Sequence, residues 1–476
     1  MAVNYKRTDY QDQLAIWTKC RDVAEGQEQV HAQGTLYLAM LQGQTPEEYK
    51  KYVGRASLYN ATSRTIDAMS GMLFRKDPLY SVPPSMMNYL YDIDMQGNTL
   101  NNFVEKIADE VIMTGRVGVL VEHPQIIVQD STVELTKADA EIGNLRPFVA
   151  QYKTEDIINW NYTTRNNVKI LSLVVLREVR ERFVDTFEPE YDERFRVLKF
   201  DENGQYMQEI WLESTDSKIG YYKAEEVFPM IQGQRFNMIP FFFITPKGII
   251  GDIVKPPILD LVNINLSHYK TTADIEHAAH YTALPTPVIT GHKLSQDNKG
   301  FKIGSSEVWV LPEAEARISY LEYAGTGLNA LEMRINKKEE QMAALGARML
   351  STDKNTIESA DTHNIKRQGE NSALGSIAAA ISDGVTKLLS IMATWLGEDN
   401  SDIYYLVNKD FVPSTMSPQT LTALLQAYQS GAIAFSDFVA QLQKGEVISV
   451  DRTPEMIMDE IENSGILAPE LNDAVV

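Results

Sequence analysis

The clearest pattern of apolar and polar positions lies between residues 255 and 397. Apolar residues recur there at steps of three and four, a spacing that places side chains on one face of an α-helix. The spacing predicts helices over 256–283, 326–349 and 359–396. The last would span roughly 57 Å at about 1.5 Å per residue. Because most globular helices are shorter, this length favours a component of a large assembly.

Each of the first two helices carries an apolar seam. The seam residues are Leu259, Val262, Leu266 and Tyr269 on the first helix, and Leu328, Leu331, Ile335 and Met342 on the second. Lys338 interrupts the second seam. Neither seam has an evident partner within the sequence.

The chain before this region mixes helix and strand. Residues 1–44 are polar and weakly helical, which suggests an N-terminal arm. Thr45 and Pro46 begin a helix, and helical periodicity continues from Arg55 to Leu73. Thr99 begins another helix that Gly115 ends, and a buried strand over 117–121 follows.

Residues 146–246 are rich in strand patterns. A turn over 201–204 joins two alternating runs as a hairpin, and the acidic run 188–193 is expected at a solvated hairpin tip. Between the first two long helices, a β-like insert covers 285–325. Near the C-terminus, a strand over 403–407 precedes three short helices that begin near Ser417, Ser436 and Thr453. The fold class predicted is therefore α+β.

Composition narrows the functional classes. The chain has 476 residues and a net charge of −21, from 44 basic and 65 acidic side chains. A protein that coats nucleic acid by neutralising phosphates needs clustered bases, so this balance argues against that class. The single cysteine, Cys20, excludes a disulfide framework. The start lacks the apolar core of a signal peptide, and the apolar run 239–244 is too short to span a bilayer. We expect a soluble protein in a reducing cytoplasm, with no membrane partner.

Candidate chemistry is sparse. The sequence has no Walker sequence and no G-x-S-x-G elbow. Glu276, His277 and His280 are the best metal candidates, because two histidines three apart on a helix can ligate zinc. The third ligand that such a site needs cannot be placed. We favour a packing role for them, together with His268, and predict no metal, cofactor or catalytic residue.

Several bases gather around the second long helix and the polar loop over 350–358. They are Arg334, Lys337, Lys338, Arg348 and Lys354, and the acids Glu332, Glu339, Glu340 and Asp353 nearly balance them. Two interpretations stay open. The bases could form a weak, sequence-independent surface over which a DNA backbone passes. They could equally form ion pairs between packed helices of adjacent subunits.

The order of these elements is similar to that of a known family. Residues 59–67 (YNATSRTID), 273–277 (ADIEH) and 345–350 (LGARML), together with the helix, insert, helix, loop and long helix, resemble the portal (head–tail connector) proteins of tailed double-stranded DNA bacteriophages, in their podovirus-type group. The resemblance covers most of residues 45–465, and its motifs are structural rather than catalytic. Residues 1–44 match nothing in the family.

The resemblance implies a portal fold of wing, stem, clip and crown. The implied parts are the wing over 45–254, the stem helices over 255–284 and 326–349, the clip over 285–325, the channel loop over 350–358, the long wing helix and strand over 359–411, and the crown with a C-terminal tail over 412–476. It implies a DNA channel near Arg334, Lys337, Lys338, Arg348, Asp353, Lys354 and Asn355, and clip contacts at Lys293, Asp297, Lys299 and Lys302.

The function implied is structural. A ring, usually of twelve copies, would occupy one capsid vertex of the virion after assembly in the host cytoplasm. The apolar seam residues of the two stem helices would then pack between neighbouring copies of this closed ring. Double-stranded DNA would pass through it during packaging and ejection, while terminase and later a tail adaptor dock to it beside the major capsid protein and scaffold. The alternatives are another capsid-assembly or ejection protein without a closed ring, and a metal-dependent nuclease that uses Glu276, His277 and His280.

Overall fold

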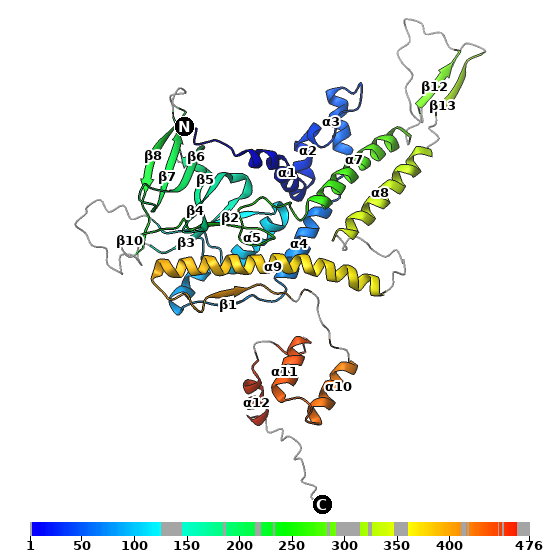
Figure 1. Ribbon diagram of the computed structural model, residues 1–476. Coiled ribbons are helices and arrows are strands. Elements are labelled where there is room, and N and C mark those ends of the chain that lie inside the picture. Colours follow the sequence, from blue (N-terminus) through cyan, green and yellow to red (C-terminus); the bar gives the residue numbers. More distant parts are fainter. Residues whose placement is uncertain are drawn as a thin grey trace, which may run out of the picture. The chain divides into compact units, whose positions relative to one another are not determined.

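A computed structural model describes most of the chain. The described residues are 2–124, 145–183, 187–214, 220–231, 234–282, 286–291, 315–321, 326–346, 360–409, 411, 416, 418–445, 447–449 and 452–463. The chain forms two compact units, Met1–Val407 and Asn408–Val476. The first contains both helices and antiparallel sheets (Figure 1), which confirms the predicted α+β class.

The N-terminal helices belong to the core of the first unit. Helix α1 (Thr8–Glu25) leads through Gly26 into α2 (Gln27–Ala32) and a 3-10 turn, η1 (Gly34–Leu36). Trp17 is fully buried, and its ring lies 5.4 Å from the guanidinium carbon of Arg116. The prediction of an arm over 1–44 is therefore wrong. Its polar residues form the solvent face of a helix whose few aromatic side chains reach the interior.

The next segment contains two helices. Helix α3 (Pro46–Arg55) begins with the predicted cap, because Thr45 and Glu48 form a reciprocal capping box. Helix α4 (Ala61–Leu73) is separate from it, so the predicted helical continuation from Arg55 is wrong over 56–60. Asn60 explains the break, since its Oδ1 accepts a hydrogen bond from the Ser63 backbone N–H at 3.0 Å and starts a new helix.

The first unit contains a three-stranded antiparallel sheet, which the chain enters after helix α5 (Leu100–Thr114). This helix is capped by Thr99 and ends at Gly115 in the left-handed region, as predicted. Strand β2 (Val117–Glu122) lies between β11 (Phe241–Ile244) and β3 (Phe148–Lys153). This arrangement confirms the predicted buried strand.

A five-stranded antiparallel sheet has its strands in sequence order. They are β4 (Ile157–Arg165), β5 (Val168–Phe183), β6 (Pro189–Phe200), β7 (Tyr206–Glu213) and β8 (Tyr221–Val227). The predicted turn over 201–204 joins β6 to β7. The acidic run flanks the tip of the β5–β6 hairpin, and residues 188–192 are exposed, as expected of a solvated position. Residues 189–193 are already part of β6, where Asp192 lies opposite Arg180 in the β5 register, so opposite charges stabilise the pairing.

The long helix α9 (Ala360–Leu396) matches the predicted span and supports the body. Its stripe from Leu374 to Met392 is buried, and it contacts α5, β2, β11 and β14 (Tyr404–Leu406). Strand β14 confirms the predicted strand near 403–407 and pairs with β1 (Leu79–Ser81). Residues 373–396 are apolar and long enough to cross a membrane, but 67% of that stretch is buried, the pattern of a core helix.

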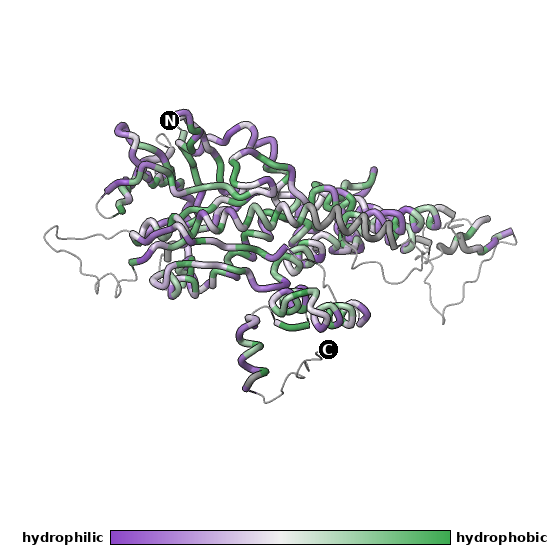
Figure 2. Tube along the Cα trace, turned by 60° about the horizontal axis from the view of Figure 1, so that its bottom comes forward, coloured by the Kyte–Doolittle hydropathy of each residue, from purple (hydrophilic) through white to green (hydrophobic). Residues whose placement is uncertain are grey.

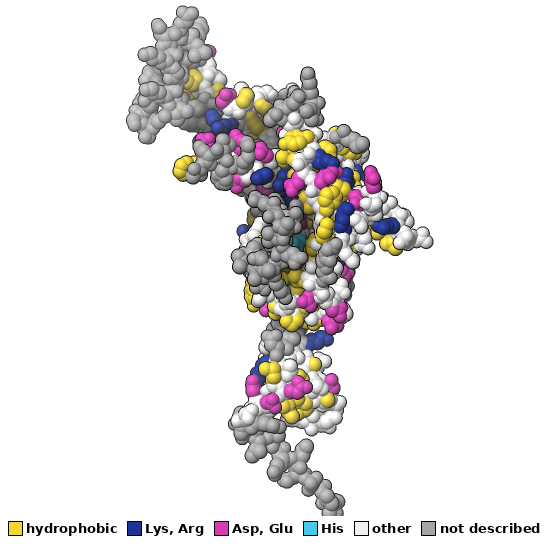
Figure 3. Space-filling view, turned by 90° about the vertical axis from the view of Figure 1, so that its left-hand side faces the viewer, with side chains coloured by type: hydrophobic (Ala, Val, Ile, Leu, Met, Phe, Trp, Pro, Cys, Tyr) yellow, Lys and Arg dark blue, Asp and Glu magenta, His cyan; other side chains and the backbone are white. Residues whose placement is uncertain are grey.

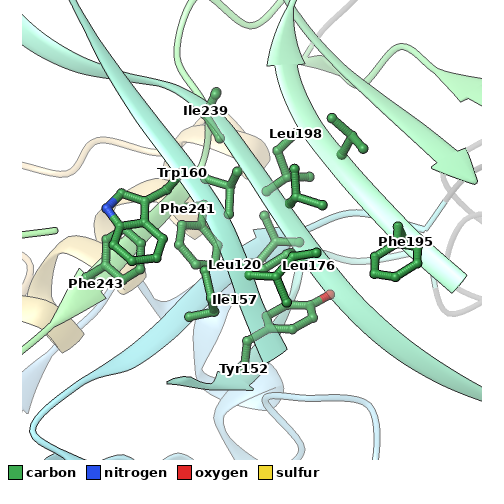
Figure 4. Packing of buried hydrophobic residues seen from close by; sticks show 14 of the residues in the cluster. Leu120, Tyr152, Ile157, Trp160, Leu176, Phe195, Leu198, Ile239, Phe241 and Phe243 are labelled. Carbon is green, nitrogen blue, oxygen red and sulfur yellow. The ribbon is translucent and has the colours of Figure 1, made fainter. Parts of the chain in front are cut away.

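Smaller elements complete the first unit. They are the 3-10 helices η2 (Pro84–Tyr91) and η3 (Thr154–Asp156) and the short pair β9 (Met230–Ile231) and β10 (Gln234–Arg235). The core between the sheets is aromatic, with Trp160, Phe241 and Phe243 packed edge to face (Figure 4). Apolar and polar positions alternate along the elements of the body (Figure 2), as expected of faces that are half buried.

The second unit is helical in its described residues. Helices α10 (Pro418–Gln429), α11 (Phe435–Lys444) and α12 (Pro454–Asn463) confirm the three short helices predicted, although α11 begins at Phe435 instead of Ser436. Within these three helices, Val439 is the buried apolar residue. The stacked rings of Tyr428 and Phe438 join α10 to α11.

Candidate functional site

The candidate site is a pair of helices that carries a β-hairpin. Helix α7 (Leu259–Thr282) and α8 (Thr326–Ala344) lie side by side, and β12 (Thr286–Thr290) pairs with β13 (Arg317–Leu321) at the end where the two helices are joined (Figure 1). This segment contains the predicted stem helices and part of the predicted clip. The hairpin confirms the β character of the insert.

The seam of α7 faces its own chain. Helix α7 contacts α1, α3, α4 and α8, and Val262, Leu266 and Tyr269 are 0%, 7% and 1% exposed. Leu259 is half buried. The expectation that these residues pack between copies is wrong, because helices of the same chain already cover them. The sequence had placed them on one face correctly, but it did not show that the N-terminal helices pack against that face.

A buried asparagine fixes α7 against α4. The Asn265 side chain is fully buried, and its Oδ1 accepts hydrogen bonds from the Thr62 backbone N–H at 3.2 Å and from Thr62 Oγ1 at 2.9 Å. Its Nδ2 donates to the Tyr59 carbonyl at 2.8 Å. These bonds join α7 to the start of α4, within the stretch 59–67. Pattern reasoning missed Asn265, since a polar residue inside a helical seam gives no signal of its partner.

A second polar contact lies further along α7. The Tyr52 hydroxyl donates to Asp274 Oδ1 at 2.7 Å, and its ring meets that of His277 edge to face at 5.1 Å. Burial raises the pKa of Tyr52, and the hydrogen bond to Asp274 raises it further. The contact joins α3 to α7, which gives the stretch 273–277 a structural role.

The seam of α8 packs against α7. Met342 is fully buried, and Leu328, Leu331 and Ile335 are half buried on the same face. The prediction that these four share a face is confirmed, but this face covers α7 of the same chain instead of another copy. Among contacts between described elements, α7 is the main neighbour of α8. On its remaining faces, the described residues of α8 are exposed, among them Glu332, Arg334 and Lys337.

Lys338 interrupts this seam and holds α8 to α7. Its Nζ donates to the Ser267 carbonyl at 2.8 Å and also bonds Thr271 Oγ1. Burial lowers the pKa of Lys338, and nearby Arg334 lowers it further. Lys338 is therefore engaged in the helix pair, which contradicts its assignment to a DNA surface.

A histidine lies on the other side of the same crossing. His268 is 5% exposed, and its Nε2 lies 3.4 Å from Glu339 Oε1. Its ring faces that of Tyr59 at 6.1 Å. Burial lowers the pKa of His268, while Glu339 acts in the opposite direction. His268 thus serves the packing surface, as expected of it.

The open faces of α8 carry charges of both signs. Arg334 and Lys337 are exposed, as are Glu332 and Glu340, and none of the four forms an ion pair with another described residue. Met333, between them, is 69% exposed. The side of the first unit that faces away from α8 likewise shows acidic and basic side chains interspersed, without one continuous basic surface among the coloured side chains in view (Figure 3).

The other predicted contact residues are not part of the described chain. Arg348, Asp353, Lys354 and Asn355 lie in the gap 347–359, and Lys293, Asp297, Lys299 and Lys302 lie in the gap 292–314. Their assignments to a channel and to the clip stay predictions.

The described residues do not complete the metal site. His277 is half buried and His280 is exposed on α7. In the part of the chain that the structure describes, no group of three His, Cys, Asp or Glu side chains is arranged to hold a metal ion. The third ligand that a nuclease would need here is therefore not found in that part.

Comparison with known proteins gives a family match of limited extent. The model of a domain of unknown function, DUF4055, matches residues 257–396, which run from the start of α7 to the end of α9. No curated protein matches the chain.

Several solved structures are similar to this chain, and three of them are components of gene transfer agent particles. One is in the virion of a native gene transfer agent particle, with a TM-score of 0.42 and 10% identity over 80% of this chain and 89% of that chain. The others are in the neck of the native particle computed with C12 symmetry (TM-score 0.40, 11% identity) and in the neck of the empty particle computed with C6 symmetry (0.40, 10%), with the same coverage. Similarity at this level establishes neither a shared role nor a shared family.

Proposed function

We propose that the chain is the subunit of a closed ring that serves as a portal for double-stranded DNA in a phage-like particle. The observation that carries the proposal is the state of α8. This 19-residue helix packs on α7 through one face, and it leaves Met333 and four charged side chains on its open faces. A helix so placed gains buried surface when a second copy packs beside it.

The order of elements supports the same proposal. Helix α7, the β12–β13 hairpin, α8 and the long α9 follow one another in the order that the portal resemblance implies. Two of the stretches that carry the resemblance, 59–67 and 273–277, make structural contacts in this chain. Asn265 binds the start of 59–67, and Asp274 within 273–277 binds Tyr52. The proposed ring is accordingly a scaffold without catalytic chemistry or cofactor.

The net charge of the chain supports a channel through which DNA slides without being bound. With a net charge of −21 per copy, a ring would repel a DNA backbone on average, so the strand would slide through without being held. The residues 350–358 are proposed as the loop nearest the strand. The hairpin end of the α7–α8 pair is proposed as the docking surface, first for terminase and then for a tail adaptor. Twelve copies at one capsid vertex of the virion is the arrangement proposed.

Electron microscopy of the purified full chain, with light scattering for mass, tests the ring directly. Rings with an axial pore wide enough for a duplex of roughly 20 Å support the portal. Particles without a pore would favour another capsid-assembly or ejection component. Monomers that cleave DNA only with added metal would favour the nuclease, and loss of that cleavage in His280→Ala would assign it to His277 and His280.

A further inference from the structure

The two flanks of α8 carry opposite charge. At about 100° per residue, Leu331, Ile335 and Met342 define the face toward α7. Glu332 and Glu339 then lie on one side of that face, and Arg334 lies on the other side, with Lys337 next to it toward solvent. All four side chains are exposed, Glu339 by 47%. One helix therefore presents an acidic flank and a basic flank.

Arg334 lacks an acidic partner on its own helix. The residues three and four positions from it are Ala330, Leu331, Lys337 and Lys338, so its neighbours at this spacing are apolar or of like charge. Lys337, by contrast, has Glu340 three positions further on. Like charges at this spacing destabilise an isolated helix, and Arg334 is among the charges that lower the pKa of Lys338. An external carboxylate would relieve the repulsion at Arg334.

The spacing of the charges fits a second copy of the chain. In a ring whose axis runs parallel to α8, equal residues of neighbouring copies lie at equal height. Arg334 and Glu332 are two positions apart, as are Lys337 and Glu339, which is about 3 Å along the helix axis. Each base would then meet a carboxylate of the next copy at nearly its own height. A contact between unlike flanks is heterologous, and such contacts close into a ring when the rotation from one copy to the next divides a full turn.

We propose that α8 of one subunit packs its Arg334–Lys337 flank against the Glu332–Glu339 flank of the next subunit, so that these ion pairs set the direction and registration of the ring. This inference rests on the proposed ring and names the surface that would build it. It assigns Arg334 and Lys337 to neighbouring protein instead of DNA. Side chains other than these two would then approach the DNA.

Charge reversal tests the pairing. Arg334→Glu should place two acids at every junction and raise the concentration at half assembly by about tenfold or more, since the exposed pair is repeated at each subunit contact. Glu332→Arg should do the same with two bases. The monomer should stay folded in Arg334→Glu, because the new carboxylate lies within reach of Lys337 and Lys338. Circular dichroism and light scattering measure both.

Rescue gives the test its specificity. The double variant Arg334→Glu with Glu332→Arg restores opposite charges at every junction and should assemble as wild type does. A mixture of the two single variants should also assemble, in rings with an even number of copies that alternate. Lys270→Glu, on an exposed position of α7, makes the same change in net charge as a control and should leave assembly unchanged.

The outcomes separate the two proposals. Wild-type protein that stays monomeric would overturn the ring and the pairing with it. Wild-type rings accompanied by single variants that assemble at an unchanged concentration would overturn the pairing alone. If those variants instead lose only their retention of DNA, Arg334 and Glu332 face the strand and the pairing is likewise wrong.

Discussion

Gly384 lies where α9 packs tightly against Ile244 of β11. A Cβ on this residue would lie 2.5 Å from Cδ1 and 2.8 Å from Cγ1 of Ile244 in β11. No real Cβ tolerates such an approach, so the helix or the strand would have to move. We expect Gly384→Ala to lower the free energy of unfolding by about 1–3 kcal/mol, the usual cost of overpacking a core. A thermal unfolding scan of the purified chain measures the change.

The same helix supplies the control. A Cβ on Gly375 would meet no described atom within 4 Å, so Gly375→Ala should raise stability by about 0.5–1 kcal/mol through helix propensity alone. Adding Ile244→Val to Gly384→Ala removes the closest methyl group and should recover part of the loss. Equal effects of the two glycine substitutions would contradict the close approach.

Residues with local partners were the easiest to predict. Thr45 caps α3 and Gly115 ends α5, both as expected. Both depend on neighbours within a few positions of sequence. Gly384 and Asn265 depend on β11 and α4, far away in the chain, so no local pattern identifies them.

Helices α7 and α8 show which features of packing the periodicity of apolar residues predicts and which it does not. The seams of α7 and α8 were found on the correct faces, yet both cover segments of the same chain. Periodicity reports which residues share a face, whereas the surface that meets the face is a property of the fold. For α7 that surface includes α1, whose polar sequence gave no indication that it packs in the core.

The crossing of α7 and α8 should respond to pH through His268. Burial lowers the pKa of His268 in the fold, so the unfolded chain, with a pKa of about 6.5, takes up the proton first as pH falls. Stability therefore drops as pH falls below about 6.5, until the lower folded pKa is passed. Glu339 opposes this drop, whereas Lys338 adds to it.

Urea unfolding at pH 8 and pH 5.5 tests whether His268 makes the stability of the chain depend on pH. The wild-type chain should lose more stability between the two conditions than His268→Gln, whose side chain takes up no proton. His280→Gln is the matched control on the exposed face of the same helix and should keep the wild-type difference. If His268→Gln kept that difference as well, the buried histidine would not be its source.

On the scale of the whole chain, the boundary between the two units follows directly after β14. Tyr405 is fully buried, stacks on Tyr80 at 6.2 Å, and donates from its hydroxyl to Asn101 Oδ1 at 3.1 Å. Its backbone N–H donates to Thr386 Oγ1 on α9 at 2.9 Å. These contacts make β14 part of the first unit, together with α9, which precedes it in the chain.

Two truncations that differ by a few residues should therefore behave differently. A chain ending at Lys409 keeps β14 and should unfold at the same temperature as the first unit of the full chain, since the units have separate internal contacts. A chain ending at Ser401 loses Tyr405, and its first unit should be less stable by about 3–5 kcal/mol, the range for removing a buried aromatic side chain. Calorimetry resolves the two cases. Similar destabilisation in both would mean that the helices α10 to α12 stabilise the first unit, and an unchanged transition in the shorter chain would show that β14 contributes nothing to it.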